Sequence, residues 1–361
     1  MINIYTSVRI PHVGGMSTHI LAVKKYLTDI GQHVRLFSKP GSTVPRSGGA
    51  NRYHPAVYLT SALLKVAHCF FAYPAASGRF NFYHDWFSIL GVRSRPGARR
   101  MLYVHGELAN ELVALGTIRK DSGWYRVFQN IERRAVRRAD IVICVDSRLA
   151  EYVRSELGVE AISKANFVST PSPVRVPVAP GDEVRLVLSR RFVEKNGLEY
   201  ALTAVDLIHA ALAPRISVRC DVFGSGQLFA ELSQRFNRPY IFFRGDVTPE
   251  DVRHCLRHGH FCMVPSIPVG DYVEATSISA LEAAVEGCIV VASNVGGLRE
   301  LFSGTGGACL VAPKDAAAIA VAVIELVRDP SAFVRTAETG QTVVLENHSD
   351  KIYVENFILK L

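Results

Sequence analysis

Short runs of hydrophobic residues alternate with amphipathic segments along nearly the whole chain. In the first half these runs are "INIYTSV", "HVRLFS", "FNFYHDW", "RMLYVHG" and "DIVICVD". In the second half they are "VRLVLSR", "SVRCDVFG", "YIFFRGD", "HFCMVPS", "CIVVAS" and "ACLVAP". Apolar runs of this length, separated by helical stretches, are typical of parallel strands that are buried on both faces. The pattern therefore predicts an α/β protein with two doubly wound sheets.

The proline-rich segment "TPSPVRVPVAPGDE" separates the two series of strands and predicts an interdomain linker. We expect two Rossmann-like domains, residues 1–173 and 174–345, that face each other across a cleft. The last residues, "KIYVENFILKL", predict an amphipathic helix, which we place at about 346–361. Ligands of doubly wound sheets bind outside the carboxyl ends of the strands, so the cleft is the expected site.

The composition is that of a globular chain, with 48% hydrophobic and 20% charged residues. It contains no run of about 18 uncharged apolar residues, and its start lacks the features of a signal peptide, so we expect a cytoplasmic protein. The seven cysteines are interpreted as reduced core thiols. Residues 1–173 carry a charge balance of +12 and the remaining residues one of −4. The basic first half favours an anionic partner such as a membrane surface.

Two carboxylates flank the start of one predicted helix. The stretch "VEATSISALEA" (273–283) places Glu274 before the helix and Glu282 two turns inside it. If Thr276 or Ser277 caps the helix, the N–H groups of Ala275, Thr276 and Ser277 are available to an anion. Buried carboxylates need hydrogen-bond donors, and sugar hydroxyls are such donors. The spacing predicts a ligand with a diphosphate between two hydroxylated ends, each held by one acid.

A glycine pair follows the first predicted strand. Gly14 and Gly15 of "VGGMSTHIL" stand beside a helix N-terminus, whose free N–H groups favour phosphate. A Gly-Gly pair taken alone more often forms an ordinary tight turn, and its position after the strand is what favours a ligand site.

The region "MVPSIPVGDYVEATSISALEAAVEGCIVVASNVGGLRELF" resembles the signature region of retaining glycosyltransferases of the GT-B fold, family 4. Further matches are "VGGMSTHIL", "FYHDWFS", "LYVHGE", "ADIVICVDSRL", "SRRFVEKNGLEYAL" and "DVFGSGQL". The resemblance implies a GT-B fold whose second domain binds the nucleotide-sugar donor and whose first domain binds the acceptor, with the C-terminal helix returning to the first domain. It also implies transfer of a sugar from a nucleotide diphosphate to an acceptor hydroxyl with retention, in glycan, polysaccharide or glycolipid biosynthesis. Neither a metal nor another cofactor is expected.

The resemblance also implies which residues bind the donor diphosphate. Arg191, or its neighbour Arg190, and Lys195 are similar to the Arg and Lys that clamp it in the family. Gly14 and Gly15 are similar to the glycines that line the same pyrophosphate.

Further residues correspond to those that contact the sugar and the ribose. Glu274 is similar to the acid that contacts the transferred sugar, and Glu282 to the acid that binds the ribose. His105 of "YVHGE" is similar to the histidine that approaches the donor sugar and phosphate. Ala275 stands where family members commonly have glycine, so the identity of the donor sugar stays open.

Several alternatives stay open at this point. "FGSGQL", with Asp246 further on, suggests dinucleotide binding, although the third glycine of that motif is missing. A paired-carboxylate glycoside hydrolase would use two acids but has no use for Arg191 and Lys195. A nucleotide-sugar epimerase of the same architecture is a further alternative, and so is a basic module that binds membrane or nucleic acid without catalysis, although we expect no nucleic-acid partner. The residues with zinc-binding side chains are His254, Cys255, His258, His260 and Cys262, but the last belongs to a buried strand.

Overall fold

The computed structural model describes residues 1–361 except 11–14, 41–53, 78–79, 171–176, 178 and 271. By the contacts between its residues, the described chain divides into two compact units. The first consists mainly of the residues up to and including Asn166 together with 270–275, and the second mainly of Phe167–Val269 and Thr276–Leu361. The predicted boundary at 173 and 174 lies outside the described residues and stays a prediction.

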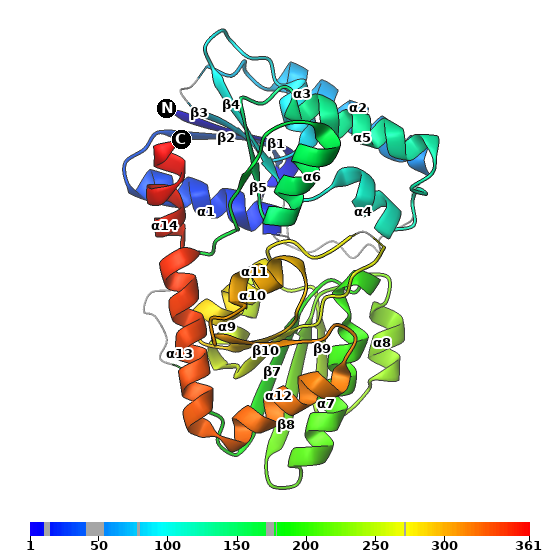
Figure 1. The fold of residues 1–361 in the computed structure, drawn as a ribbon, viewed down its shortest axis with the longest axis vertical. Helices are drawn as coiled ribbons and strands as arrows, with labels where there is room; N and C mark the ends of the chain where they lie inside the picture. Colours follow the sequence, from blue (N-terminus) through cyan, green and yellow to red (C-terminus); the bar gives the residue numbers. More distant parts are fainter. Residues whose placement is uncertain (11–14, 41–53, 78–79, 171–176, 178, 271) are drawn as a thin grey trace. The chain divides into compact units, whose positions relative to one another are not determined.

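The first unit contains a six-stranded parallel sheet with the order β2-β1-β3-β4-β5-β6 (Figure 1). Its strands are β1 (Ile2–Ile10), β2 (Val34–Pro40), β3 (Phe80–Tyr83), β4 (Arg99–Val104), β5 (Ile141–Cys144) and β6 (Ile162–Ser163). Its helices are α1 (Gly15–Asp29), α2 (Pro55–Ala72), α3 (Trp86–Gly91), α4 (Leu108–Ala114), α5 (Gly123–Val136) and α6 (Ser147–Leu157).

The second unit contains another six-stranded parallel sheet, with the order β12-β11-β10-β7-β8-β9. Its strands are β7 (Glu183–Ser189), β8 (Ser217–Phe223), β9 (Ile241–Gly245), β10 (Phe261–Val264), β11 (Ile289–Ser293) and β12 (Ala308–Val311). Its helices are the 3₁₀ helix η1 (Glu194–Asn196), α7 (Leu198–Leu212), α8 (Phe229–Arg235), α9 (Pro249–His258), α10 (Ile278–Val285), α11 (Gly296–Phe302), α12 (Ala316–Arg328), α13 (Pro330–Asn347), α14 (Asp350–Asn356) and the 3₁₀ helix η2 (Ile358–Lys360).

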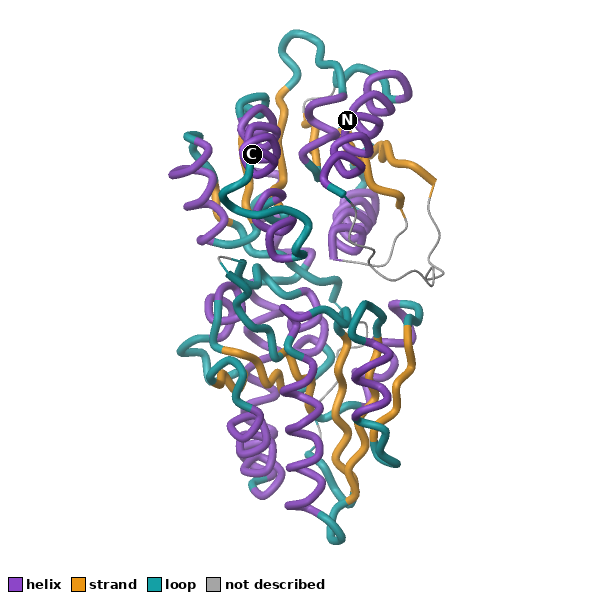
Figure 2. Tube along the Cα trace, turned by 90° about the vertical axis from the view of Figure 1, so that its right-hand side faces the viewer, coloured by secondary structure: helices purple, strands orange, loops and turns teal. Residues whose placement is uncertain are grey.

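Helices cover both faces of each sheet, as the apolar runs predicted. Every residue of β10 and β11 is buried, which is the pattern of a parallel strand between two helical layers. Figures 1 and 2 show the strands of each unit lying between helices. Each unit also has its own apolar core. The predicted α/β class with two doubly wound sheets is therefore confirmed.

Asp85 shows how the strand ends of the first unit are fixed. Its carboxylate accepts hydrogen bonds from the backbone N–H groups of Phe87 and Ser88, at 3.0 and 2.8 Å, and so caps α3. It also accepts hydrogen bonds from the hydroxyls of Thr6 and Ser7, both at 2.8 Å, on the neighbouring strand β1. One buried carboxylate thus joins β1, just after the residues that pair with β3, to the start of α3, at the edge where ligands of such sheets bind.

The C-terminal helical segment packs on residues just before the predicted linker. Residues Val168 and Ser349 form an isolated bridge, and the rings of Phe167 and Tyr353 have centroids 4.3 Å apart. The single helix predicted at about 346–361 is interrupted, because α13 ends at Asn347 and α14 begins at Asp350. Its return to the first domain stays a prediction.

Candidate functional site

Polar side chains from three segments gather around Arg190 at the carboxyl edge of the second sheet. Arg190 directly follows β7, and its Nη1 donates to the hydroxyls of Ser277 and Ser279, at 3.0 and 3.2 Å. Its Nη2 donates to Ser266 Oγ at 2.7 Å and to Asn196 Oδ1 at 2.9 Å. Ser266 follows β10, Asn196 ends η1, and the other two serines stand at the start of α10. One guanidinium therefore holds three segments of the strand-end edge together.

The start of α10 offers backbone N–H groups beside this guanidinium. Ser277 is the N-cap residue, but among the described residues its side chain makes no capping hydrogen bond to the helix and instead accepts from Arg190. Thr276 and Ser277 are buried, and Ala275 is half-buried. A helix start, with the positive end of its dipole, and a fixed cation together suit a phosphate. The predicted anion site at Ala275 to Ser277 thus has a cation next to it.

The two neighbouring arginines occupy different environments. The side chain of Arg190 reaches the start of α10, whereas that of Arg191 is exposed. The carbonyl oxygen of Arg191 accepts a hydrogen bond from Asn196 Nδ2 at 2.7 Å. Lys195 is buried in η1, and its carbonyl oxygen accepts from the Ile267 N–H at 2.9 Å. The geometry brings Arg190 rather than Arg191 to the helix start.

Glu282 lies in α10 and is half-buried. Burial raises its pKa to about 7; the positive charge of Arg253 opposes this rise, and the negative charge of Glu286 adds to it. Glu286 itself is buried and forms an ion pair with Arg257 at 3.1 Å. The carboxyl group of Glu282 is therefore poised to titrate near neutral pH.

Glu274 lies in the loop that precedes α10. It is half-buried, and its loop, residues 270–275, groups by contacts with the first unit. The sequence prediction that it contacts the transferred sugar stays a prediction.

In the first unit, three histidine rings meet near the carboxyl end of β4. His105 Nε2 lies 3.2 Å from His84 Nδ1, and the ring of His19 has its centroid 5.3 Å from each of the other two. His19 Nδ1 also lies 3.1 Å from Asn166 Oδ1. Burial lowers the pKa of all three, that of His105 to about 4, so the rings are neutral at pH 7. They can donate or accept hydrogen bonds without adding charge.

Sequence reasoning selected His105 but missed the other two rings. His19 belongs to "VGGMSTHIL" and His84 to "FYHDWFS", both segments that carried the resemblance. His84 follows the end of β3 as His105 follows the end of β4, and β3 pairs with β4. Adjacent strand ends were the signal that could have joined these two histidines.

The glycine pair is only partly described. Gly14 lies outside the described residues, and Gly15 is the first residue of α1. The helix therefore begins at the second glycine, and the role of the pair at the pyrophosphate stays a prediction.

The glycines of "FGSGQL" have a packing role that explains them without a dinucleotide. A Cβ on Gly224 would lie 2.2 Å from the carbonyl oxygen of Arg190, and one on Gly226 would lie 2.5 Å from that of Phe192. Asp246, the suggested ribose ligand, accepts a hydrogen bond from Ser225 Oγ at 2.5 Å. This loop packs against the segment that carries Arg190, so its glycines serve that site.

The rings of His254 and His258 have centroids 4.9 Å apart, but the other zinc-binding side chains do not complete a site with them. Within the described parts of the chain, no group of three or more His, Cys, Asp or Glu side chains is arranged to hold a metal ion. His260 Nδ1 accepts from the Arg185 N–H at 3.0 Å, and Cys262 is buried in β10. The structure therefore gives this set no role as a zinc site.

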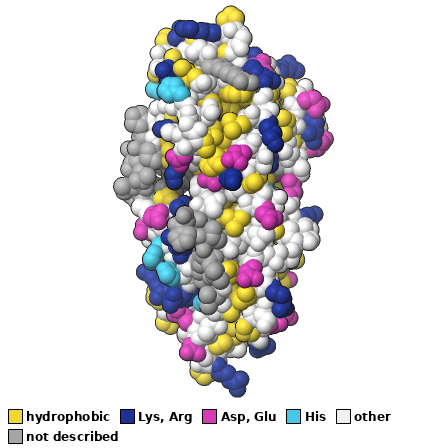
Figure 3. All heavy atoms as spheres, turned by 90° about the vertical axis from the view of Figure 1, so that its left-hand side faces the viewer, with side chains coloured by type: hydrophobic (Ala, Val, Ile, Leu, Met, Phe, Trp, Pro, Cys, Tyr) yellow, Lys and Arg dark blue, Asp and Glu magenta, His cyan; other side chains and the backbone are white. Residues whose placement is uncertain are grey.

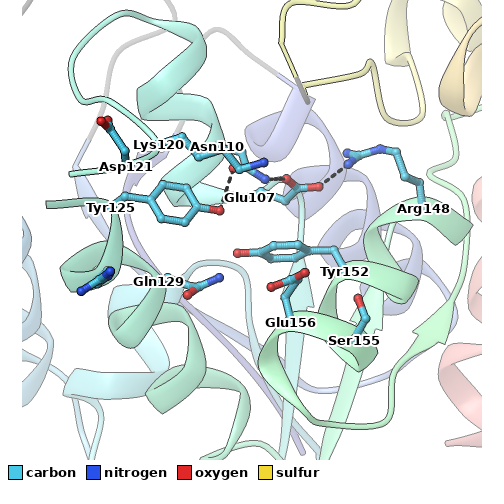
Figure 4. A pocket seen from close by; sticks show the side chains of 11 residues that line it. Glu107, Asn110, Lys120, Asp121, Tyr125, Gln129, Arg148, Tyr152, Ser155 and Glu156 are labelled. Carbon is cyan, nitrogen blue, oxygen red and sulfur yellow. Dashed lines mark hydrogen bonds and ion pairs between the residues drawn. The ribbon is translucent and has the colours of Figure 1, made fainter. Parts of the chain in front are cut away.

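A separate polar cavity of about 560 Å³ lies in the first unit (Figure 4). Its walls come from α4, α5, α6 and the turn between α4 and α5. The sequence analysis missed it, because its side chains are spread over three helices and form no local motif.

Comparison with known proteins identifies the family. Residues 13–170 match the family described as Glycosyltransferase Family 4, and residues 183–329 match Glycosyl transferases group 1. The chain belongs to glycosyltransferase family 4, a retaining, metal-independent family of enzymes that use nucleotide sugars. The prediction of a glycosyltransferase is confirmed, which favours it over a hydrolase, a dehydrogenase and a non-catalytic module.

Solved structures with the same fold include several glycosyltransferases. Sucrose-phosphate synthase from Thermosynechococcus elongatus has a TM-score of 0.72 at 19% identity, over 100% of this chain and 98% of that one. WaaG, a glycosyltransferase involved in lipopolysaccharide biosynthesis, has a TM-score of 0.68 at 15% identity, over 95% of each chain. HepE from Anabaena, in complex with UDP and glucose, has a TM-score of 0.66 at 12% identity, over 100% and 99%. The likeness confirms the predicted GT-B fold. No curated protein shows significant sequence similarity to this chain.

Proposed function

We propose that this glycosyltransferase extends a glycan, polysaccharide or glycolipid and holds the donor diphosphate at the start of α10. The observation that supports this site is the Arg190 guanidinium, hydrogen-bonded to Ser277, the residue that begins the helix. Lys195 supplies a second positive charge. Glu282 accepts from the ribose hydroxyls, and Glu274 accepts from those of the transferred sugar.

The charges fit the reaction that the family performs. When the bond between the anomeric carbon and the diphosphate breaks, its electron pair stays on the phosphate oxygen, where negative charge grows. Fixed cations and a helix N-terminus stabilise that charge without having to reorganise. The acceptor oxygen bonds to the anomeric carbon on the same face, and its proton passes to the departing phosphate. Since His105 is neutral, it orients the donor by hydrogen bonding and does not add charge.

A thermal-shift panel tests the donor site. UDP is the first nucleotide to try, because the structures of HepE and of TarM from S. aureus contain it; GDP, ADP, CDP and TDP complete the series, with NAD and NADP as controls and EDTA throughout. One nucleoside diphosphate should raise the melting temperature, since a ligand at 100 times its Kd stabilises the fold by about 2.7 kcal/mol. Lys195→Met should remove this shift, and Lys351→Met, at an exposed lysine on α14, should keep it. Stabilisation by NAD alone, or an undiminished shift in Lys195→Met, would refute the site.

For the location, we propose a cytoplasmic enzyme that sits on the inner face of a membrane through α2. By length and composition α2 is apolar enough to cross a bilayer, and only 11% of it is buried. Lys65 interrupts it, which is why sequence analysis found no uncharged run there. Its inner side, with Ala62 and Cys69, belongs to the core of the first unit, so it can lie on a membrane but not span one. The large side chains exposed along α2 are Val57, Leu63, Leu64, Phe70 and Phe71.

Charge on the same unit suits an anionic lipid surface. The Arg93 guanidinium lies 5.2 Å from the centre of the Phe70 ring, so a cation stands beside the apolar face of α2. On the described part of the face in Figure 3, Lys and Arg side chains lie among acidic and hydrophobic ones and form no single broad patch. An exposed apolar helix face with a cation beside it favours a membrane over nucleic acid.

Flotation with vesicles tests the membrane proposal. The wild-type protein should float with phosphatidylcholine vesicles that contain phosphatidylglycerol, and less so at high salt, because salt screens exposed charges. Leu64→Glu combined with Phe71→Glu should abolish flotation, since these side chains are 65% and 82% exposed and the change costs no core packing. Val321→Glu is the matched control, at a valine that is 51% exposed on α12. Equal flotation of the double variant, or none for the wild type, would contradict the proposal.

A further inference from the structure

The cavity of the first unit has a rigid, neutralised wall. Glu107 is 1% exposed and accepts hydrogen bonds from Arg148 and from Asn110. Asn110 Oδ1 in turn accepts from the Tyr125 hydroxyl at 3.0 Å. Figure 4 shows this chain of contacts running along one side of the cavity. The charge of Glu107 is thus paired, and the side chains of this wall hold one another in place.

A second buried carboxylate fixes another part of the wall. Glu132 accepts from the Tyr152 hydroxyl at 2.7 Å and from the Leu108 N–H at 2.6 Å. Tyr152 is 8% exposed and lines the cavity, so its ring is held against α5. Two tyrosines from different helices, Tyr125 and Tyr152, therefore border one space in fixed orientations (Figure 4).

The remaining groups of the cavity favour an uncharged ligand. Three acidic side chains line it (Glu107, Asp121 and Glu156) and three basic ones (Lys120, Arg126 and Arg148), so their charges balance. Gln129 and Ser155 add an amide and a hydroxyl. Such groups hydrogen-bond to hydroxyls, and tyrosine rings pack against apolar C–H faces. A sugar ring presents both, and a volume of about 560 Å³ lies within the usual range for small-molecule sites.

The cavity also begins close in sequence to His105, the residue proposed to orient the donor. Glu107 comes two residues after His105, at the carboxyl end of β4, and is the N-cap residue of α4. A ligand held against Glu107 and Asn110 is therefore anchored to the same strand end as the histidine. That position suits the molecule that receives the sugar.

The geometry points to this cavity as the subsite for an uncharged sugar unit of the acceptor. The inference rests on the proposed function, because a glycosyltransferase needs a site for the acceptor and His105, at the same strand end, is the residue proposed to orient the donor. It deepens that proposal by identifying the acceptor as a neutral glycan. The residues that contact this glycan are Gln129, Tyr125 and Tyr152.

Saturation-transfer NMR with simple glycosides tests the subsite. The probes are the methyl glycosides of glucose, galactose, mannose and N-acetylglucosamine, together with glycerol phosphate and methyl glucuronide as anionic comparisons. At least one neutral glycoside should receive saturation from the wild-type protein. The signal should fall several-fold in Gln129→Trp, which fills the cavity, and in Gln129→Ala, which removes only the amide. Gln234→Trp, at an exposed glutamine on α8, should leave it unchanged.

Two results would overturn the subsite: no neutral glycoside binds the wild-type protein, or the Gln129 variants bind as well as it does. Preferential binding of the anionic probes would equally refute a neutral acceptor. A melting curve for each variant excludes unfolding as the cause of a lost signal, and Gln129→Ala serves where Gln129→Trp fails to fold. Stabilisation by the nucleoside diphosphate that the thermal-shift panel identifies, measured in the same samples, separates this failure from that of the proposed function, since it persists when only the acceptor assignment is wrong.

Discussion

Replacing Arg190 with alanine is expected to reduce sugar transfer by about 100- to 1000-fold, the usual effect of removing one fixed donor from a site where charge develops. The guanidinium lies where the leaving diphosphate gains negative charge, and it also joins Ser266, Asn196 and Ser277. Its loss removes a cation and loosens the segments that hold the start of α10. The effect is measured as the initial rate of sugar transfer at a saturating donor concentration. The rate is monitored by the nucleoside diphosphate that the reaction releases.

Two comparison variants separate charge from geometry. Arg190→Lys keeps a positive charge, but one ammonium cannot reproduce the fork that reaches four oxygen atoms, so most of the loss should persist. Arg191→Ala should lose much less activity, because its side chain is exposed. If Arg191→Ala proved the more damaging of the two alanine variants, the assignment of the diphosphate contact to Arg190 would be wrong. Melting curves of all three variants show whether the fold is retained.

The fold was predictable because parallel strands that are buried on both faces appear in the sequence as short, continuous apolar runs. Each apolar run corresponds to a strand, and β10 within "HFCMVPS" and β11 within "CIVVAS" are buried along their whole length. The C-terminal segment was less predictable. "NHSDKIYVEN" contains both the end of α13 and the start of α14, and the break depends on Ser349, which caps α14 and bridges to Val168. A contact with a residue about 180 positions away leaves no local pattern.

The candidate site was predictable in its residue types but not in its side-chain directions. The pair Arg190 and Arg191 follows β7, where the alternation of a strand gives way to a turn, so spacing alone could not tell which side chain reaches α10. The environment decides it: the hydroxyls of Ser266, Ser277 and Ser279 lie around Arg190. These serines lie 76 to 89 positions after Arg190 in the sequence, so no local pattern shows that they surround it.

The cavity of the first unit and the exposure of α2 could not be predicted from the sequence, and the reason differs from that for Arg190. Helix α2 has apolar residues on every side, and a sequence with that pattern predicts a buried helix. Only its packing shows that Phe71 is 82% exposed. The cavity depends on Glu107, Tyr125 and Tyr152 meeting from three elements, which a one-dimensional pattern does not record.

Binding of the nucleoside diphosphate is expected to weaken as the pH falls below about 7, because Glu282 must be ionised to accept hydrogen bonds from both ribose hydroxyls. Burial raises its pKa to about 7, so protonation competes with the ligand just below neutrality. With a pKa of 7, the carboxylate is mostly present at pH 8, and only about one molecule in ten carries it at pH 6. The Kd should therefore rise about tenfold between these values. Arg253 and Glu286 also act on this carboxyl group, so a variant at Glu282 itself is the decisive comparison.

Calorimetric titration with the nucleoside diphosphate at pH 8, 7 and 6 measures this effect in the wild type and in Glu282→Gln. The glutamine has nearly the same shape and does not titrate, so its Kd should be higher at pH 8 and should change less with pH. The variant also corrects for the ligand, since phosphate groups titrate near pH 6 in both proteins. A pH dependence that is the same in both proteins would place the ribose away from Glu282. In that case the raised pKa would reflect the burial of α10 alone, and the second acid of "VEATSISALEA" would have no contact with the donor.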